Sequence, residues 1–371
     1  MHIKTLHLRD FRNYSDQSLE LNPGLNIFVG DNAQGKTNLL EAIYVLSLSK
    51  SYRTGRETEL IKHGANQTII HAQVQKMARL DLAVQVSLAT SKKLLVNQKS
   101  TNANSFVGQL NTVLFTPDSL QLVKGSPGDR RRFLDIQICQ IDAVYRTTLL
   151  KYQRVVRQRN SLLKEAQIQR SLVKQVPVWD TQLVALGSEL IWRRQEILSI
   201  LEEFAQRAHE TISHELENLQ VAYAPFFAAN TQEHKQYTLA EIEQFFWSEL
   251  KDRREEELRR GYTLVGPQRD DIIFLINGLD LKTFGSQGQQ RTAVLAYILA
   301  ELELMSREAG EYPVVLLDDV MSELDQTRRS FLLSILNRKA QTIVTTTNLA
   351  SFDEKTRQEA RIFRIESGRI L

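Results

Sequence analysis

Cysteine is almost absent from this chain of 371 residues, and no long apolar run occurs in it. The single cysteine, Cys139, excludes an internal disulfide and a metal site built from several cysteines. Its apolar surroundings, DIQICQI, favour a core thiol over a reactive one. No stretch approaches the roughly 18 apolar residues that a membrane span requires, and charge interrupts MHIKTLHLRDFR too often for a secretory signal. We therefore expect no membrane association and a cytoplasmic location.

The composition that remains is that of an ordinary globular protein, with 42% hydrophobic and 25% charged residues. The length allows one large domain with an insertion, or two domains. Net charge is only +3, yet residues 126–175 carry eleven Lys or Arg against four acids, a local charge of +7. Such an excess favours a polyanionic partner, although a solvated helix face often carries as much charge.

The hydrophobic periodicity changes along the chain. Alternating runs such as IKTLHL, SLELN and LNIFVG predict strands in the first 120 residues, with a helix at KTNLLEAIYVLSLS and a returning strand at TVLF. From residue 126 to about 218 the spacing is helical. Two helices of about 30 residues, separated by VPVWD, are expected to pair antiparallel as an arm. Ser126 and Asp129 predict a capping box at its start.

Strand signals return towards the end of the chain. A third helix is expected to end at Gly261, followed by strands at GYTLV and IIFLI and a hairpin at Asn277-Gly278. The run from VVLLDD through QTRRSFLLSILNRK to TIVTTT alternates strand, helix and strand, with IFRI and GRIL closing. We therefore predict an α/β head of residues 1–125 and 262–371, interrupted by a helical arm of residues 126–261.

The segment GDNAQGKT fits the phosphate-binding pattern G-x-x-x-x-G-K-[ST] at every position. It follows the strand LNIFV and opens a helix, so its backbone N–H groups are expected to surround phosphate oxygens. Lys36 would reach the β- and γ-phosphates, and the Thr37 hydroxyl would ligate Mg²⁺. A plain glycine-rich turn is the alternative, which the flanking strand and helix disfavour. The predicted contacts are Gly30, Asp31, Asn32, Ala33, Gln34, Gly35, Lys36 and Thr37.

A nucleotide site also needs a carboxylate for the metal at the end of a buried strand, and VVLLDD supplies two. Asp318 would hold Mg²⁺ through water, and Asp319 is placed to orient or deprotonate the attacking water. Adjacent acids after an apolar run are common. It is the presence of a complete phosphate-binding loop in the same chain that supports the assignment of these two acids to a nucleotide site.

The polar stretch FGSQGQQR runs directly into the apolar helix TAVLAYILAELELM. It could be a simple hairpin exit with a helix start. Alternatively, the unpaired N–H groups of that helix face something negative.

GDNAQGKT, FGSQGQQR and VVLLDDVMSELD together resemble the ABC-type ATPases of the chromosome-maintenance and Rad50 group, whose head is split by a helical insertion. More narrowly, HLRDFRNY, LFTPDSLQLVKGSPGDRRRFLD, GPQRDD and FGSQGQQRT resemble the RecF family of bacterial recombination proteins. The resemblance implies ATP and Mg²⁺ as cofactors, an ATP-dependent homodimer and sequence-independent binding to duplex DNA and its junctions. It also implies action with RecR and RecO in loading RecA at single-strand gaps.

The same resemblance implies roles for further residues. Ser286, with Gln287 and Gly288, would touch the γ-phosphate held by the other subunit. Asp325 would communicate across that interface, and Arg12 with Asn13 would approach the nucleotide. Arg12 could instead be a surface arginine, and Asp325 a helix N-cap.

The sequence also departs from the family's pattern. Ala33 stands where glycine is usual, Asp319 replaces the usual glutamate, and Thr345 to Thr347 occupy the place of a switch histidine. We therefore expect weak ATPase activity that suits a timed switch, with a turnover not above about 1 s⁻¹.

Arg130, Arg131 and Arg132 are the preferred candidates for DNA contact, through phosphates and without reading sequence. A chromosome-maintenance tether would need hundreds of coiled-coil residues, and a transporter motor would need membrane partners. An SMC/Rad50-like head in which ATP acts as glue, without meaningful turnover, remains open.

Overall fold

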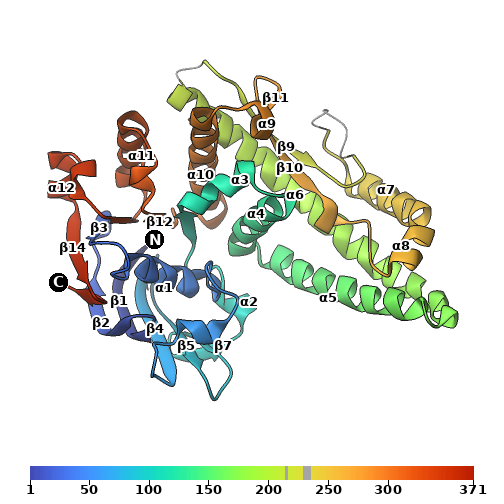
Figure 1. The fold of residues 1–371 in the computed structure, drawn as a ribbon, viewed down its shortest axis with the longest axis horizontal. Coiled ribbons are helices and arrows are strands. Elements are labelled where there is room, and N and C mark those ends of the chain that lie inside the picture. Colours follow the sequence, from blue (N-terminus) through green and yellow to red (C-terminus); the bar gives the residue numbers. More distant parts are fainter. Residues whose placement is uncertain (214–215, 229–234) are drawn as a thin grey trace. The chain divides into compact units, whose positions relative to one another are not determined.

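The computed structural model describes residues 1–213, 216–228 and 235–371 (Figure 1). The chain forms two compact units, one of residues 1–119 and 301–371, the other of residues 120–300. Residues 262–300, which the sequence grouped with the head, lie in the helical unit. Among the described residues no helix is both long and apolar enough to cross a bilayer.

The first unit contains an antiparallel sheet in the order β2-β1-β4-β5-β6-β7. Its strands alternate buried and partly exposed side chains, as expected of a sheet with one face against a core. The predicted strands IKTLHL and SLELN are thereby confirmed. The strands are β1 (His2–Phe11), β2 (Tyr14–Glu20), β4 (Gln67–Gln75), β5 (Arg79–Ser87), β6 (Lys93–Val96) and β7 (Lys99–Thr101).

A second sheet in this unit has the order β15-β14-β3-β13-β12-β8 and is parallel apart from β15. Its central strands are buried along their whole length, as parallel strands covered on both faces are. Strands from both ends of the chain therefore share one sheet. They are β3 (Leu25–Val29), β8 (Thr112–Phe115), β12 (Val314–Asp318), β13 (Thr342–Thr346), β14 (Arg361–Glu366) and β15 (Arg369–Ile370).

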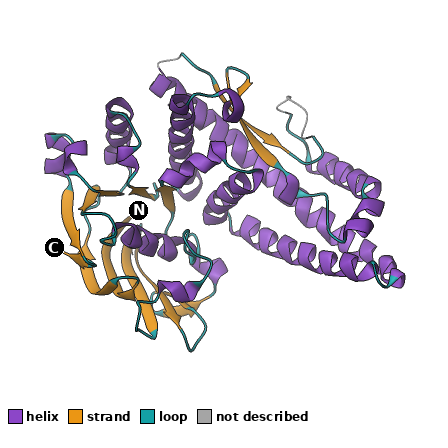
Figure 2. Ribbon diagram, in the orientation of Figure 1, coloured by secondary structure: helices purple, strands orange, loops and turns teal. Residues whose placement is uncertain are grey.

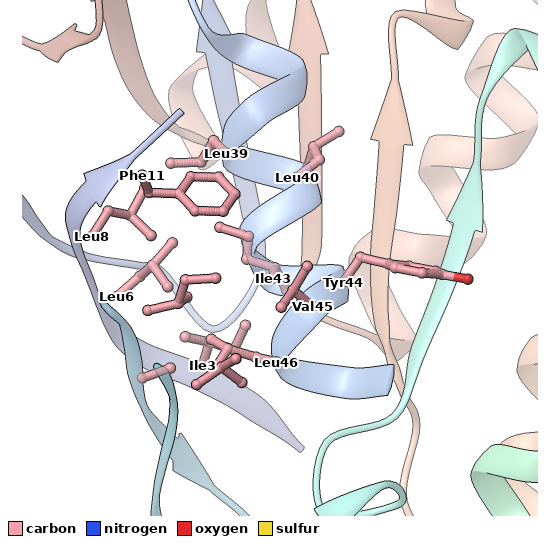
Figure 3. Packing of buried hydrophobic residues seen from close by; sticks show 14 of the residues in the cluster. Ile3, Leu6, Leu8, Phe11, Leu39, Leu40, Ile43, Tyr44, Val45 and Leu46 are labelled. Atoms are coloured by element: carbon pink, nitrogen blue, oxygen red, sulfur yellow. The ribbon is translucent and has the colours of Figure 1, made fainter. Parts of the chain in front are cut away.

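The helix α1 (Lys36–Leu48) packs against strands of both sheets, β12 and β13 on one side and β4 and β5 on the other. Figure 3 shows Leu6, Leu8 and Phe11 of β1 beside the apolar side chains of α1. This core fixes the start of α1 relative to the carboxyl ends of the parallel strands. The other helices of this unit are η1 (Glu57–Leu60), α2 (Ala103–Phe106), η5 (Val320–Ser322), α11 (Gln326–Lys339), η6 (Leu349–Ser351) and α12 (Glu354–Glu359).

The second unit is mainly helical (Figure 2), and α5 (Ala143–Ala166) packs along α6 (Val176–Ser213). They have 24 and 38 residues, in place of two equal helices. The predicted break VPVWD is the first turn of α6, because Pro177 is tolerated where no intrahelical N–H bond is needed. The remaining helices begin with η2 (Pro117–Leu120), at the unit boundary, and continue with α3 (Gln121–Lys124), α4 (Pro127–Ile141), η3 (Arg170–Gln175), α7 (Leu239–Asp252), α8 (Arg254–Arg260), η4 (Pro267–Arg269), α9 (Leu281–Phe284) and α10 (Gln287–Ala309), which ends in the first unit.

Several local predictions in this unit are confirmed. Ser126 and Asp129 form the capping box of α4, Gly261 ends α8 in a left-handed conformation, and Asn277-Gly278 turns the hairpin. The predicted strand GYTLV is wrong, because side chains of Asn160 and Glu257 take the N–H groups of this segment that a ladder would use. The second unit contains one described sheet of three strands, β9 (Leu219–Ala224), β10 (Asp271–Ile276) and β11 (Leu279–Asp280).

The core of the second unit contains buried charges. Arg159 is fully buried and pairs with Asp180 and Glu257. Asp270, also fully buried, accepts hydrogen bonds from Arg194 and from the Phe226 N–H. The Arg159 pairs join α5 to α6 and α8, and the Arg194–Asp270 pair joins α6 to the loop before β10, so polar contacts as well as apolar packing hold this unit together.

Cys139 is only half-buried on α4, contrary to the expectation of a core thiol. The buried face of that helix includes Leu134 and Ile138, which places Cys139 at its edge. All three tryptophans, Trp179, Trp192 and Trp247, lie in this second unit.

Candidate functional site

The loop between β3 and α1 has the conformation that a phosphate-binding loop requires. Gly35 has φ 119° and Ala33 has φ 65°, both in the left-handed region. A Cβ on Gly35 would lie 2.6 Å from Asn13 Nδ2, and one on Gly30 would lie 2.4 Å from the Ile365 carbonyl oxygen. The glycines are therefore required by close packing as well as by conformation. Ala33 adopts a positive φ without glycine, at some cost in strain.

Lys36 is held over this loop. Its ammonium donates hydrogen bonds to the carbonyl oxygens of Gly30 (2.6 Å) and Asp31 (2.8 Å). Burial lowers the pKa of Lys36, while the charges of Asp319 and Asp318 oppose that shift. The arrangement places one cation among backbone N–H groups at a helix N-terminus, which is chemistry suited to an anion.

Asp318 ends the buried strand β12 and faces the start of α1. Its Oδ1 accepts hydrogen bonds from the hydroxyls of Thr37 (3.0 Å) and Thr345 (2.8 Å). The Tyr52 hydroxyl lies 3.4 Å from Oδ2, and burial holds the pKa of that phenol well above its usual range, so it is a proton donor. A hydroxyl and a carboxylate converging beside a phosphate-binding loop are the oxygen ligands that Mg²⁺ prefers.

Asp319 follows in the left-handed conformation, with φ 53°. Its N–H donates to Thr345 Oγ1 (3.0 Å), which fixes the turn after the strand. The pKa of Asp319 is raised, because desolvation and the nearby charge of Asp318 outweigh the opposing effect of Lys36. A carboxylate with a raised pKa beside a metal-type site is suited to accepting a proton.

The hairpin β1–β2 braces the loop from one side. Asn13 Nδ2 donates to the Gln34 carbonyl (2.9 Å), and the Tyr14 hydroxyl donates to the Gly35 carbonyl (2.9 Å). The Gly368 N–H, in the turn between β14 and β15, donates to the same Gln34 oxygen (3.0 Å). The Asn13 side chain therefore holds the loop by a hydrogen bond to the backbone of the loop.

Arg12 is not a free surface arginine. Its guanidinium makes a two-pronged pair with Glu41, at 2.9 and 2.7 Å, and donates to the Glu59 carbonyl (2.7 Å). Glu41 is fully buried and is also bound by Arg53 and Ser51. Neither Glu41 nor Arg53 was singled out from the sequence, because no short motif contains them.

Asp325 is the N-cap of α11, accepting from the Arg328 N–H (2.9 Å). That backbone hydrogen bond lowers the pKa of Asp325. Its side chain is half exposed and also pairs with Arg328. The helix-cap alternative thus describes its local geometry, and it leaves the carboxylate accessible.

The turn FGSQGQQR lies in the second unit, with Ser286 at the N-terminus of α10. The Ser286 N–H donates to Gln289 Oε1 (2.8 Å), and the Gln289 N–H donates to Ser286 Oγ (3.2 Å). This reciprocal pair has the form of a capping box. Ser286 and Gln287 are exposed and Gly288 is half-buried, so the first turn of α10 is accessible.

A second contact holds this turn from behind. Gln289 Nε2 donates to Glu217 Oε1 (2.8 Å), and Glu217 lies just before β9. Gln290 Nε2 donates to the carbonyls of Leu281 (3.1 Å) and Gly285 (3.3 Å). Gln289 and Gln290 therefore fix the turn from its inner side, while Ser286 and Gln287 on the outer side are exposed to solvent.

The three arginines proposed for DNA contact differ in exposure. Arg130 is buried and pairs twice with Asp271, both contacts at 2.7 Å. Arg131 is half-buried, donates to the Asp270 carbonyl, and has its pKa lowered by burial. Arg132 alone is exposed. Arg130 is therefore committed within the protein and does not present its charge to a ligand.

Comparison with known proteins places this geometry in a family. Residues 2–370 match the model of the RecF/RecN/SMC N-terminal domain. The chain is 42% identical over 370 residues to the DNA replication and repair protein RecF of Halalkalibacterium halodurans, covering 99% of this chain and 98% of that protein.

Solved structures agree. The recombination mediator protein RecF with ATP, from the RecFOR pathway, superposes with a TM-score of 0.90 at 32% identity, covering 100% of this chain and 97% of that one. The Smc head domain from Pyrococcus furiosus, solved with the C-terminal domain of ScpA, has a TM-score of 0.57 at 14% identity over 100% of this chain and 96% of that one, which shows a shared fold. The fold is thus that of an ABC-type ATPase head with a helical insertion, and the chain belongs to the RecF family.

Proposed function

We propose that this protein is an ATP-dependent DNA-binding protein of recombinational repair, in which ATP joins two copies and slow hydrolysis separates them. The observation that carries the proposal is the convergence of Lys36, Thr37 and Asp318 around one loop. A relative 32% identical over the whole chain has been solved with ATP, which supports the same ligand here.

Each residue of this site then has a task. The N–H groups of Asp31 to Thr37 and the Lys36 ammonium bind the phosphates. Thr37 and Asp318 hold Mg²⁺, which, when bound, neutralises charge on the phosphate oxygens. Asp319 accepts the proton of the attacking water, because it is the carboxylate that directly follows the metal-binding Asp318. Arg12 and Asn13 act from behind the loop, since their side chains are held by Glu41 and Gln34.

The turn at Ser286 contacts the γ-phosphate of the partner subunit. Its accessible Ser286 and N–H groups at the start of α10 support this assignment. Asp325 is also accessible, and we assign it to communication across the dimer interface. A dimer of this kind is isologous, so two equivalent composite sites form together.

Hydrolysis is slow in this proposal, because Asp319 is one methylene shorter than the glutamate usual in such ATPases. Thr345 also supports Asp318 and Asp319 by hydrogen bonds where many relatives carry a histidine. The turnover should not exceed about 1 s⁻¹. A faster enzyme would contradict the timed-switch mechanism.

DNA is held through its phosphates without sequence readout, at duplex regions and single-strand gaps. The relative's pathway name, RecFOR, supports RecR and RecO as partners. RecA as the recombinase that is loaded, and a cytoplasmic location, rest on the family resemblance alone. In function, the ATPase head comprises residues 1–125 and 262–371, because Ser286 of the second compact unit takes part in the nucleotide site, and residues 126–261 form the arm.

Mixing two variants tests the composite site. Lys36→Ala and Ser286→Arg proteins should each be inactive alone and regain ATP hydrolysis together, since the heterodimer contains one intact site. The matched control is the double variant Lys36→Ala/Ser286→Arg mixed with either single variant, because no dimer in those mixtures contains an intact site. Mixed dimers that fail to recover ATP hydrolysis would refute the proposal that each site is built from both subunits.

The second candidate function is a head glued by ATP without meaningful turnover, which the strained Ala33 and shortened Asp319 favour. ATP turnover measured with and without gapped DNA separates the two. Hydrolysis that gapped DNA changes supports the switch, and hydrolysis indistinguishable from a Lys36→Ala blank supports the glue.

A further inference from the structure

The cations of the second unit fall into two groups by environment. Of the eleven between residues 126 and 175, Arg130, Arg146 and Arg159 are buried and hydrogen-bonded within the protein. Others lie along α5 in exposed positions. The α5 stripe is defined here as Lys151, Arg154, Arg157 and Lys164, all of which are exposed.

The stripe occupies one face of the helix. At 100° per residue its four members fall within an arc of about 140°, opposite the face that carries Tyr152, Arg159 and Leu163 towards the core. Lys151 and Lys164 are about 20 Å apart along the axis at 1.5 Å per residue. Arg170 and Lys174, also exposed, follow in η3.

None of the four stripe side chains makes a hydrogen bond or an ion pair with the described part of the chain. The one acid on this face, Glu165, accepts a hydrogen bond from Ser161 (3.1 Å). Like charges at i and i+3 repel each other, so the stripe costs stability unless an anion neutralises it.

Other exposed arginines of the same unit behave differently. Arg207 pairs with Glu203, Arg253 with Glu249 and Glu256, and Arg260 with Glu256, all at helical spacings of three or four residues. Each of these three arginines is neutralised by an acid about one turn away, whereas the four cations of the α5 stripe have no such partner among the described residues.

We propose that the α5 stripe binds the phosphate backbone of duplex DNA. It is a linear row of unpaired cations spanning about 20 Å, and duplex DNA carries one charge per roughly 1.7 Å of axis along its surface. Arginine and lysine side chains on an exposed helix reach phosphates without any base contact, which gives sequence-independent binding. This inference rests on the proposed DNA-binding function and names the surface that performs it.

The test is the binding of full-length protein, with ATP and Mg²⁺, to a fluorescent 40-base-pair duplex over a series of salt concentrations. The variant is Lys151→Ala/Arg154→Ala/Arg157→Ala. Losing three phosphate contacts should lower the salt-dependence slope by about 2.7 and weaken binding at least tenfold near 0.1 M salt, roughly as counterion release requires. Each single substitution should lower the slope by about 0.9.

The matched control, Arg207→Ala/Arg253→Ala/Arg260→Ala, removes the same charge from paired arginines of the same unit. It should change affinity by less than about threefold. Equal losses in both triple variants, or an unchanged slope in the α5 variant, would overturn the proposal. Tryptophan fluorescence and ATP-dependent dimerisation check that each variant is folded. Wild-type protein that binds no duplex with ATP would refute the proposed function itself.

Discussion

The Thr37 hydroxyl lies 3.0 Å from the Asp318 carboxylate, although 281 residues separate them in sequence. The contact joins the first turn of α1 to the end of β12. It places a hydroxyl and a carboxylate at the mouth of the phosphate-binding loop, where a divalent cation needs oxygen ligands.

Asp318→Asn should therefore abolish Mg²⁺-dependent ATP hydrolysis while keeping the fold. The amide preserves shape and an acceptor for Thr37 but removes the charge that holds the metal, so a loss of at least 100-fold in kcat is expected, about 2.7 kcal/mol or more. Asp118→Asn, an exposed carboxylate outside the phosphate-binding loop, is the control and should retain most activity. Full activity of Asp318→Asn would remove this residue from the site.

Gly35→Ala should abolish nucleotide binding. Its φ of 119° is strained for alanine, and the added Cβ would meet Asn13 Nδ2 at 2.6 Å, so the loop must move. Gly55→Ala is the matched control, because nothing lies within 4 Å of a Cβ there. Equilibrium binding of a fluorescent ATP analogue measures both. Equal affinity of the two variants would contradict the packing argument.

Arg130→Ala should destabilise the second unit, by about 1–3 kcal/mol, because it leaves Asp271 without its double pair in a partly buried place. Arg132→Ala, one exposed position away on the same helix, should stay within about 0.5 kcal/mol. Urea unfolding followed by tryptophan fluorescence reports this unit alone, since it contains all three tryptophans. Equal stability of both variants would show that the pair contributes nothing.

Asp270 makes stability depend on pH. Burial raises the pKa of Asp270 to about 6, above its ordinary value of 3.8. The folded state then binds the proton more tightly than the unfolded state, so the contribution of this group to stability falls as pH rises from about 4 to 6. Relative to Asp270→Asn, the wild type should lose up to about 3 kcal/mol between pH 4 and pH 7. A constant difference between the two proteins across that range would contradict the shift.

Glu217 should support activity without touching nucleotide. Glu217→Leu removes the acceptor of Gln289 Nε2, which frees the side chain that caps Ser286. We expect kcat to fall about tenfold with little change in ATP affinity, while Glu217→Gln, which keeps an acceptor oxygen, should recover most of the rate. A loss of ATP affinity equal to the loss of rate would point to general unfolding.

Local patterns in the sequence carried much of the fold and part of the site. The strand before GDNAQGKT, the capping box at Ser126 and the hairpin at Asn277-Gly278 each depend on neighbours within a few residues, and each is present. The phosphate-binding loop is recognisable for the same reason, since its chemistry is contained in eight consecutive positions.

Contacts between segments that are far apart in the sequence could not be predicted from local sequence patterns. Charge counting treated Arg159 as one more surface cation, yet it is fully buried because Asp180 and Glu257 arrive from other helices. Glu41 anchors Arg12 from a helix that reads simply as apolar. Partners of this kind depend on the completed fold, which neither periodicity nor propensity encodes.

The position of β3 in its sheet has a consequence for synthesis of the protein. Its two neighbours are β13 and β14, so the strand that leads into the phosphate-binding loop has no partner until residues 342–366 exist. At about 5–20 residues per second, the ribosome needs roughly 15–60 s to travel from β3 to β13. During that time β3 and the side of α1 that packs against β12 and β13 have no sheet to pack on, so we expect the nascent head to bind ATP only after its last strands are made.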